Sequence, residues 1–213
     1  MYIPKAFEQT DIAALHDFMR VRRFGTIVTV TSDGLVANHI PFVLEPEPAP
    51  FGMLRGHVAR ANPLWRDYSS DIEALAIVSG DDAYISPTWY PTKRETAKVV
   101  PTWNYMVVHA YGHLRFVDDP VWVRAHLEAL TDEQEVGRHP RWYVSDAPSE
   151  FIERIAQGVV GLELPISRLE GKWKLSQNRG PADRAGAIEG LRSEGTQPAS
   201  RIADAMLRLR APE

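Results

Sequence analysis

The segment at positions 56–63, which reads Gly-His-Val-Ala-Arg-Ala-Asn-Pro, carries residue types that suit an anion-binding site. Arg60 offers a fork of N–H donors that matches the oxygens of a phosphate or a carboxylate, and His57 precedes it on the same segment. Asn62 and the proline after it predict a turn, whose backbone amides would add further donors. A strand-to-helix turn with a surface arginine would have the same sequence, so the segment alone leaves both interpretations open.

Two segments rich in aromatic and hydroxyl side chains could bind a flat ligand. Residues 84–90 read Tyr-Ile-Ser-Pro-Thr-Trp-Tyr, and Trp89 in this proline-bounded stretch could stack on a ring. Thr102 and Asn104 alternate with Trp103 at the start of a predicted strand, so the two polar side chains share one face and the tryptophan lies on the other. Each segment could instead be packing at the end of a barrel, and the residues by themselves do not decide between these interpretations.

The segment 171–179 is dense in hydrogen-bond donors. It contains two lysines, a serine, a glutamine, an asparagine and an arginine within nine positions. Lys174 and Gln177 could therefore hold a phosphate or the polar edge of a ring. The alternative is a solvated C-terminal segment, although Trp173 and Leu175 indicate that the segment is packed.

Other kinds of site are not indicated by the sequence. His109 and His113 are four residues apart, which on a strand separates them by roughly 13 Å, too far to share a metal ion. We therefore predict no metal site. The chain has no cysteine, which excludes disulfides and thiolate chemistry and is typical of a cytoplasmic protein. No serine–histidine–aspartate or paired-carboxylate pattern indicates hydrolysis.

The hydrophobic pattern predicts a meander of strands with inserted helices. Its clearest element is 102–117, where two faces of different polarity alternate, and we expect this to be the longest strand. Two prolines and a charge cluster predict an irregular loop at 87–98. Further strands are expected at Phe24–Thr31, 35–44, 51–58, 72–79, 83–86 and 159–167, and helices at 12–19, 64–68, 120–130 and 148–157. This order favours a mainly β, antiparallel barrel, and the lack of a GxGxxG after any strand argues against a dinucleotide-binding α/β sheet.

Length and charge set limits on domains and partners. The 213 residues suit one domain at 1–178 and a tail at 179–213, whose short helix at 202–209 belongs to the same unit. No apolar run is long enough to cross a bilayer. The net charge is −4, so DNA binding, which depends on neutralising phosphates, is only weakly supported. It would depend on local basic clusters, namely Arg20, Arg22 and Arg23; Lys93, Arg94 and Lys98; and Arg208 and Arg210.

Five motifs in a fixed order resemble the PaiB family of FMN-binding transcriptional regulators. They are His39-Ile40-Pro41-Phe42, the 56–63 segment, the 84–90 segment, Val100-Pro101-Thr102-Trp103-Asn104-Tyr105 and Lys174-Leu175-Ser176-Gln177-Asn178-Arg179. The start of the chain, Met1-Tyr2-Ile3-Pro4 with Phe7, is also similar to that family, and the resemblance extends to about Arg210.

The resemblance implies an FMN-binding split barrel, mainly β and antiparallel, related to pyridoxamine-phosphate oxidase and built as a homodimer. It implies FMN near the subunit interface, with Arg60 at the phosphate. We expect Asn62 to assist Arg60 and Trp89 or Trp103 to cover the ring. The implied cofactor residues are His39, Pro41, His57, Arg60, Asn62, Trp89, Thr102, Trp103, Asn104, Lys174 and Gln177, the last two reaching the site from the second subunit. Aromatic residues on the outer face of 102–117 would anchor the dimer interface.

Three functions remain open at this stage. The family resemblance implies a transcriptional regulator that responds to flavin or to its redox state. The same fold could instead serve a flavin-dependent oxidoreductase acting on an unknown small substrate, because a fold does not fix a function. A third reading is a split barrel that binds haem or another flat cofactor through His39, His57 or His109.

Overall fold

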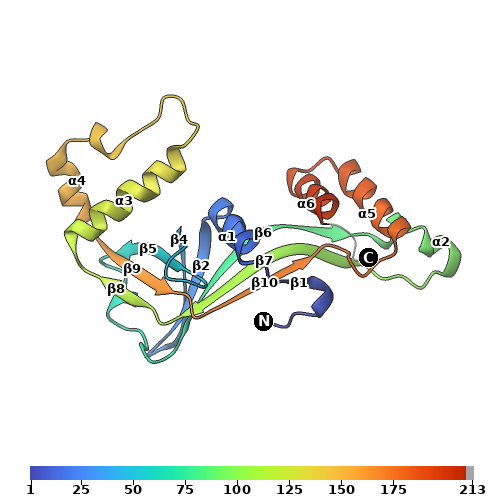
Figure 1. The fold of residues 1–213 in the computed structure, drawn as a ribbon, viewed down its shortest axis with the longest axis horizontal. Coiled ribbons are helices and arrows are strands. Elements are labelled where there is room, and N and C mark those ends of the chain that lie inside the picture. The colour runs from blue at the N-terminus through green and yellow to red at the C-terminus, as the bar shows by residue number, and fades with distance from the viewer. Residues whose placement is uncertain (210–213) are drawn as a thin grey trace. The chain divides into compact units, whose positions relative to one another are not determined.

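The computed structural model describes residues 1–209, and its chain divides into two compact units (Figure 1). The first unit comprises Met1–Asp11, Ser79–Val108 and the described residues from Glu170 onward. The second comprises Ile12–Val78 and His109–Leu169. Three long strands, β6 (Ala74–Ile85), β7 (Thr102–Gly112) and β10 (Arg168–Lys174), continue from one unit into the other. Arg210, which belongs to one of the predicted basic clusters, lies outside the described residues.

The second unit contains a four-stranded antiparallel sheet and a long hairpin. The sheet has the order β4 (Val43–Glu45), β5 (Met53–Ala59), β9 (Val159–Pro165) and β8 (Arg115–Val117). The hairpin joins β2 (Phe24–Thr31) to β3 (Gly34–Pro41), and β2 also pairs with the first part of β6. The helices of this unit are α1 (Ile12–Val21), η2 (Pro63–Trp65), α3 (Pro120–Glu135), η4 (Val144–Asp146) and α4 (Ser149–Ala156).

Local sequence signals account for the start of the hairpin turn and of α3. Gly34 has a φ of 108°, which glycine adopts without strain, so a tight turn at 32–34 closes the hairpin. The side chain of Asp119 accepts a hydrogen bond from the backbone N–H of Val121 at 2.9 Å, and Pro120 fills the first helical position. Both features are typical of a helix N-terminus and set the direction in which α3 leaves β8.

The first unit combines a sheet segment with two C-terminal helices. β1 (Glu8–Gln9) pairs with β10, and the larger sheet has the order β1-β10-β7-β6-β2-β3. α5 (Pro181–Ser193) and α6 (Gln197–Arg208) pack against each other (Figure 1). The shorter helices of the unit are η1 (Lys5–Phe7), η3 (Pro87–Trp89) and α2 (Thr92–Thr96).

Each unit buries apolar side chains of its own. In the second unit, Leu54 of β5 and Leu162 of β9 are fully buried on one face of the smaller sheet. In the first unit, Leu191 of α5 and Ile202 and Met206 of α6 are fully buried, and the last two are four residues apart on one helix face. The C-terminal helices therefore form part of a core.

The structure corrects the predicted strand at 102–117. β7 ends at Gly112, and β8 pairs in the other sheet. A Cβ atom at Gly112 would lie 2.0 Å from the carbonyl oxygen of Pro165, so the chain passes β9 at a distance that only glycine allows. The longest strand is β6, which has 12 residues against 11 in β7. β6 also joins the two strands predicted at 72–79 and 83–86 into one.

The sequence did not predict β10, η3, α2 or α5. The region 87–98 was predicted to be irregular, but Ser86 caps η3 by accepting from the backbone N–H of Thr88 at 3.2 Å, and α2 follows. α5 contains Gly186 and Gly190 in its interior, and glycine is a poor helix former, so propensity argues against a helix there. A Cβ atom at Gly190 would lie 2.1 Å from Cδ2 of Trp89, which explains why glycine occupies this position.

Candidate functional site

The second unit contains five of the predicted cofactor residues, and the first of these is His39 on β3. Its side chain is exposed, and its Nδ1 lies 2.8 Å from the hydroxyl of Thr26 on the neighbouring strand. Pro41 ends the same strand and is partly exposed. The imidazole of His39 therefore has an ordered position and keeps its Nε2 side available to a ligand.

Asn62 is tied to a residue that the sequence analysis did not single out. Its Nδ2 donates to Oδ1 of Asn38 at 2.7 Å, and its Oδ1 accepts from the backbone N–H of Leu64 at 2.9 Å, which caps η2. The amide group of Asn38 is half-buried, and its Nδ2 is a buried donor with no partner among residues 1–209. A buried donor of this kind normally has a partner, so Asn38 is a candidate ligand contact.

The guanidinium of Arg60 is occupied within the protein. Its two Nη atoms donate to the two carboxylate oxygens of Asp118 at 2.9 and 2.5 Å, and its Nε donates to the carbonyl oxygen of Gln157 at 2.6 Å. The hydrogen bonds with Asp118 raise the pKa of Arg60 and lower the pKa of Asp118. Arg60 therefore links β5 to the start of α3 and to the end of α4, and a phosphate would have to displace Asp118 to reach its fork.

His57 lies in the interface between β5 and α3. Its Nδ1 is 3.2 Å from Nε2 of His126 on α3, and the ring of Trp122 stacks on His126 with centroids 5.1 Å apart. Burial lowers the pKa of His57. Burial, followed by the charges of His57 and Arg55, lowers the pKa of His126 to about 4. Both imidazoles are therefore neutral near pH 7, and His57 is engaged in holding α3 on the sheet.

A buried carboxylate completes this interface and was not predicted from the sequence. Glu163 of β9 is 5% exposed and accepts hydrogen bonds from Nε of Arg55 at 3.2 Å and Nε of Arg115 at 2.7 Å. Nε1 of Trp122 donates to the same carboxylate at 3.0 Å. Three strands and α3 are thus joined by one acid, and only the pairing of β5, β9 and β8 brings these residues together.

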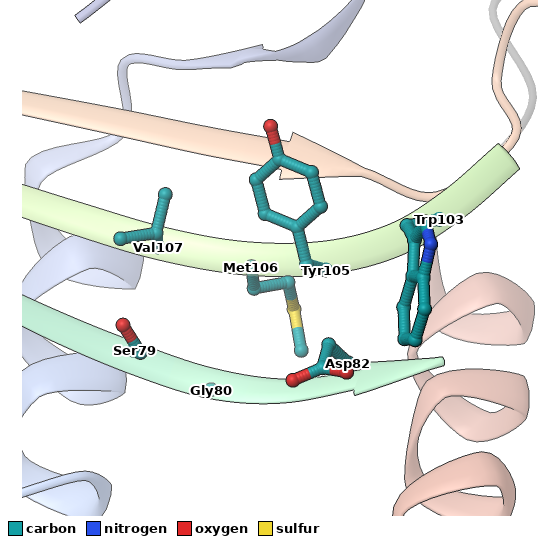
Figure 2. Close-up of a pocket in the computed structure, with 7 residues that line it drawn as sticks. All are labelled: Ser79, Gly80, Asp82, Trp103, Tyr105, Met106 and Val107. Atoms are coloured by element: carbon teal, nitrogen blue, oxygen red, sulfur yellow. The ribbon is translucent and has the colours of Figure 1, made fainter. Parts of the chain in front are cut away.

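The first unit has a cavity of about 390 Å³ beside β6 and β7. Figure 2 shows Trp103 and Tyr105 on β7 and Asp82 on the neighbouring β6. Trp103 is 53% exposed, and its ring meets that of Tyr84 edge-on at 5.9 Å. The cavity lining consists of Ser79, Gly80, Asp82, Trp103, Tyr105, Met106 and Val107.

Lys174 and Thr102 lie beside one end of this cavity. Nζ of Lys174 donates to the carbonyl oxygen of Trp103 at 2.8 Å and to the hydroxyl of Thr102. Burial, and then the charges of Lys172 and Arg179, lower the pKa of Lys174. The structure therefore brings three predicted site residues together, namely Thr102, Trp103 and Lys174.

The other three predicted residues of the first unit hold its C-terminal segment. Asn104 is fully buried, and its Nδ2 donates to the hydroxyl of Ser176 at 3.0 Å and to the sulfur of Met206 at 3.4 Å. Gln177 bonds the backbone of its own segment by accepting from the N–H of Leu175 at 2.6 Å. Trp89 packs over Gly190, as described above. Asn104 therefore fastens the segment after β10 and α6 to β7, and Trp89 packs η3 on α5.

The cavity and its surroundings fit the parts of a flavin mononucleotide. Trp103 and Tyr105 can contact a flat ring, and polar groups on Asp82, Ser79 and Lys174 can meet its polar edge. The positive charge on Lys174 and its neighbours suits an anionic phosphate. Within the described chain, no three histidine, aspartate or glutamate side chains lie together as metal ligands, and no helix is long and apolar enough to span a membrane.

Comparison with known proteins places the chain in a family. A family model described as a putative FMN-binding domain matches residues 1–168. Protease synthase and sporulation protein PAI 2 of Bacillus subtilis is 31% identical over 206 residues, covering 97% of this chain and 96% of that protein. An uncharacterised protein of Emericella nidulans is 32% identical over 239 residues, covering 96% of this chain and 95% of its own length.

Two solved structures share the fold at low sequence identity. The flavocytochrome Anf3 of Azotobacter vinelandii gives a TM-score of 0.59 at 14% identity, covering 84% of this chain and 74% of that one. The FAD and haem binding protein of Mycobacterium smegmatis gives 0.56 at 17% identity, covering 78% and 73%. The mainly β, antiparallel split-barrel fold predicted from the sequence is confirmed, and the family match confirms FMN as the cofactor. The chain belongs to the family of FMN-binding domains that includes the PaiB-type protein PAI 2.

Proposed function

We propose that this protein is a homodimeric, PaiB-type regulator that holds FMN at the cavity of its first unit. The observation that carries this proposal is the cavity of about 390 Å³ lined by Trp103 and Tyr105. Its volume lies within the roughly 300–1,000 Å³ of small-ligand sites, and aromatic walls suit the flat flavin ring.

The residues beside the cavity would orient the flavin and shield it. Trp103 and Met106 offer apolar surface that excludes water from the ring, while Asp82 and Lys174 provide an acceptor and a charged donor for its polar edge. FMN, when bound, supplies electron-transfer chemistry. The protein would tune that chemistry through the charge of Lys174, since a positive charge near the ring favours the anionic, reduced form.

In the proposed homodimer, residues of the second unit are further proposed cofactor contacts. His39 and Pro41 lie on an exposed strand, and the unpartnered Nδ2 of Asn38 is a donor suited to a carbonyl or phosphate oxygen. For Arg60 and Asn62 we propose a phosphate role in which the phosphate takes the place of Asp118 on the guanidinium. His57, Trp89, Asn104 and Gln177 would support the site indirectly, because their side chains are engaged in packing and internal hydrogen bonds.

Dimerisation is supported by exposed apolar surface in each unit. Trp103 of the first unit is 53% exposed, and Phe24 and Leu35 of the β2–β3 hairpin are 67% and 78% exposed. β3 is the last strand of its sheet, and an uncovered apolar edge strand favours association. Light scattering at micromolar concentration should report a dimer, and a stable monomer would contradict this part of the proposal.

A regulatory role is supported by the relative named for protease synthesis and sporulation. A flavin-dependent oxidoreductase is the alternative, and steady-state turnover of NAD(P)H with a small electron acceptor would favour it. Since the net charge is −4, we expect direct DNA binding to be weak and strongly salt-dependent. Tight, sequence-selective binding at physiological salt would contradict that expectation.

A haem-binding function would have to use His39. His57 faces His126 in a buried interface, and Nδ1 of His109 lies 3.4 Å from the hydroxyl of Tyr111. His39 alone of the three histidines considered is exposed. The absorption spectrum of the purified protein separates the two cofactors, because haem gives an intense Soret band and FMN does not.

The experiment that tests FMN binding is a spectrum taken after incubation with FMN and desalting. Retained flavin absorbance at a stoichiometric level, with quenched flavin fluorescence, is the expected result. Loss of all flavin on desalting, together with no fluorescence quenching at micromolar protein, would remove the cofactor proposal.

A further inference from the structure

Three basic side chains meet at the end of β10. Lys172 and Lys174 are two residues apart on one strand and therefore point to the same face. Ser176 has a φ of 61°, and the backbone N–H of Arg179 donates to its carbonyl oxygen at 3.1 Å, so the chain turns back after β10. The charges of Lys172 and Arg179 both contribute to lowering the pKa of Lys174, after burial. Lys172 and Arg179 therefore both act on the charge of Lys174, and we name the three residues the cation cluster.

No member of the cation cluster forms a direct ion pair with a carboxylate in the described chain. Nearby acids are committed elsewhere. Glu170 binds the N-terminal ammonium at 2.8 Å, and Asp183 accepts from the backbone N–H of Thr92 at 3.1 Å.

The cation cluster rests on aromatic rings. Nζ of Lys172 lies 5.4 Å from the ring centre of Tyr105, and the guanidinium of Arg179 lies 5.0 Å from that of Tyr90. A cation–π contact is weaker than an ion pair and does not neutralise the charge. Lys172 is only 9% exposed, and its Nζ donates to the carbonyl oxygen of Tyr2 at 3.0 Å, so its positive charge is largely removed from water and meets a backbone dipole in place of a counter-charge. Burying positive charge in this way costs free energy unless an anion binds beside it.

Two members of the cation cluster, Lys172 and Lys174, contact residues that line the cavity of the first unit. Lys174 donates to the carbonyl oxygen of Trp103, and Lys172 lies over Tyr105; both aromatic residues line the cavity (Figure 2). An ammonium group has three N–H donors, and Lys174 uses two of them on Trp103 and Thr102. The third donor is available to a ligand group at the rim of the cavity.

We propose that Lys172, Lys174 and Arg179 form a seat for a phosphate or carboxylate group of a ligand that occupies this cavity. The inference rests on the proposed function only in part. One source of the anion is the phosphate of FMN itself, in place of the Arg60 assignment. The other is an anionic second ligand that binds beside the flavin. In both cases the seat must bind an anionic oxygen group through positively charged N–H donors.

Two variants and three probes test the seat. Lys174→Gln removes the charge and keeps an N–H donor for the carbonyl oxygen of Trp103. Arg179→Gln removes the positive charge that lies in the turn after β10. Lys93→Gln is the matched control, because Lys93 is an exposed lysine on α2 of the same unit. Binding of FMN, of riboflavin, which lacks the phosphate, and of inorganic phosphate is measured by fluorescence and calorimetry, with circular dichroism confirming that each variant is folded.

If the seat holds the phosphate of FMN, both variants should weaken FMN binding roughly tenfold or more, the effect of losing a charge-assisted contact, and Arg179→Gln should leave riboflavin binding unchanged. If the seat holds a second anion, Arg179→Gln should leave FMN binding unchanged, while binding of inorganic phosphate to the FMN-loaded variant weakens by a similar factor. Wild-type affinity of a folded Arg179→Gln protein for both FMN and phosphate would overturn the seat. If the wild type binds no flavin, the proposed function fails, and phosphate binding to the flavin-free protein still tests the seat.

Discussion

Nδ1 of His57 lies 3.2 Å from Nε2 of His126, so a half-buried and a buried imidazole join α3 to the smaller sheet of the second unit. Arg55 of β5 and Arg115 of β8 also face this interface, and their charges are met by Glu163 of β9. Arg55 binds Glu45 of β4 as well, at 3.1 Å. The two arginines and the two glutamates balance one another, so protonation of either histidine would add an unbalanced positive charge. The packing of α3 is therefore sensitive to acid.

The free energy of unfolding should fall as the pH drops from 7 towards 4. The pKa of His126 is lowered to about 4 from an ordinary value of 6.5. Because the pKa of His126 is lower in the folded protein, the unfolded chain takes up its proton first as the pH falls. The free energy of unfolding is therefore highest above pH 6.5 and decreases below it. The loss should be on the order of 2–3 kcal/mol by pH 4. Denaturant titrations at several pH values measure it.

His126→Phe should flatten this pH dependence, since it removes the group with the larger shift. His139→Gln, at an exposed position in the loop after α3, is the control and should leave the profile unchanged. A pH profile of His126→Phe as steep as that of the wild type would show that other groups control acid stability.

Gly190→Ala should destabilise the protein by about 1–3 kcal/mol, although alanine is the better helix former. The new methyl group would lie 2.1 Å from Cδ2 of Trp89, an atom at the base of a large ring that cannot move aside easily. Gly180→Ala is the control, because a Cβ atom there meets nothing within 4 Å. Thermal melts of the two variants should differ clearly, and equal melting temperatures would contradict the packing of Trp89 on α5.

Asn104→Leu should lower the free energy of unfolding by about 1–3 kcal/mol, because it leaves the buried hydroxyl of Ser176 without its partner. The affinity for FMN, measured well below the melting temperature, should change little. A large loss of FMN affinity at unchanged stability would instead show that Asn104 contacts the cofactor, as the family resemblance implies.

Asp118→Asn tests the phosphate role proposed for Arg60. If phosphate and Asp118 compete for the guanidinium, weakening the carboxylate contact should tighten FMN binding by roughly two- to fivefold, the range for an exposed ion pair. Riboflavin binding should not change, because riboflavin has no phosphate. Unchanged FMN affinity would leave Arg60 with its structural role only.

The sequence predicted the fold well where local patterns determine it. The hairpin at 24–41 follows from its turn residues, and α3 follows from Asp119 and Pro120 at its start. The sequence did not predict features that depend on a contact between residues far apart in the chain. Gly112 ends β7 because it passes Pro165, and Gly190 lies within α5 because Trp89 packs on it. Neither contact can be recognised from the residues next to it in the sequence.

The sequence allowed us to predict which residues belong to the candidate site, but not which residues they contact. Thr102, Trp103 and Lys174 were selected for their chemistry, and the pairing of strands then brings the three together, with Trp103 lining the cavity. His57 and Arg60 were selected on the same grounds, but His126 and Asp118 meet them from distant parts of the chain. Asn38 and Glu163 gave no signal, because their importance lies in burial and in partners that only the fold supplies.

The central claim is that FMN binds at the cavity lined by Trp103, and one titration tests it most directly. FMN binding is followed by fluorescence quenching for the wild type, Trp103→Ala and the control Trp142→Ala, whose exposed ring lies in the loop between α3 and α4. Loss of the aromatic contact should weaken binding roughly tenfold, the effect of about 1–3 kcal/mol of stacking, while the control binds like the wild type. Equal affinity in all three proteins, each shown to be folded, would contradict the account.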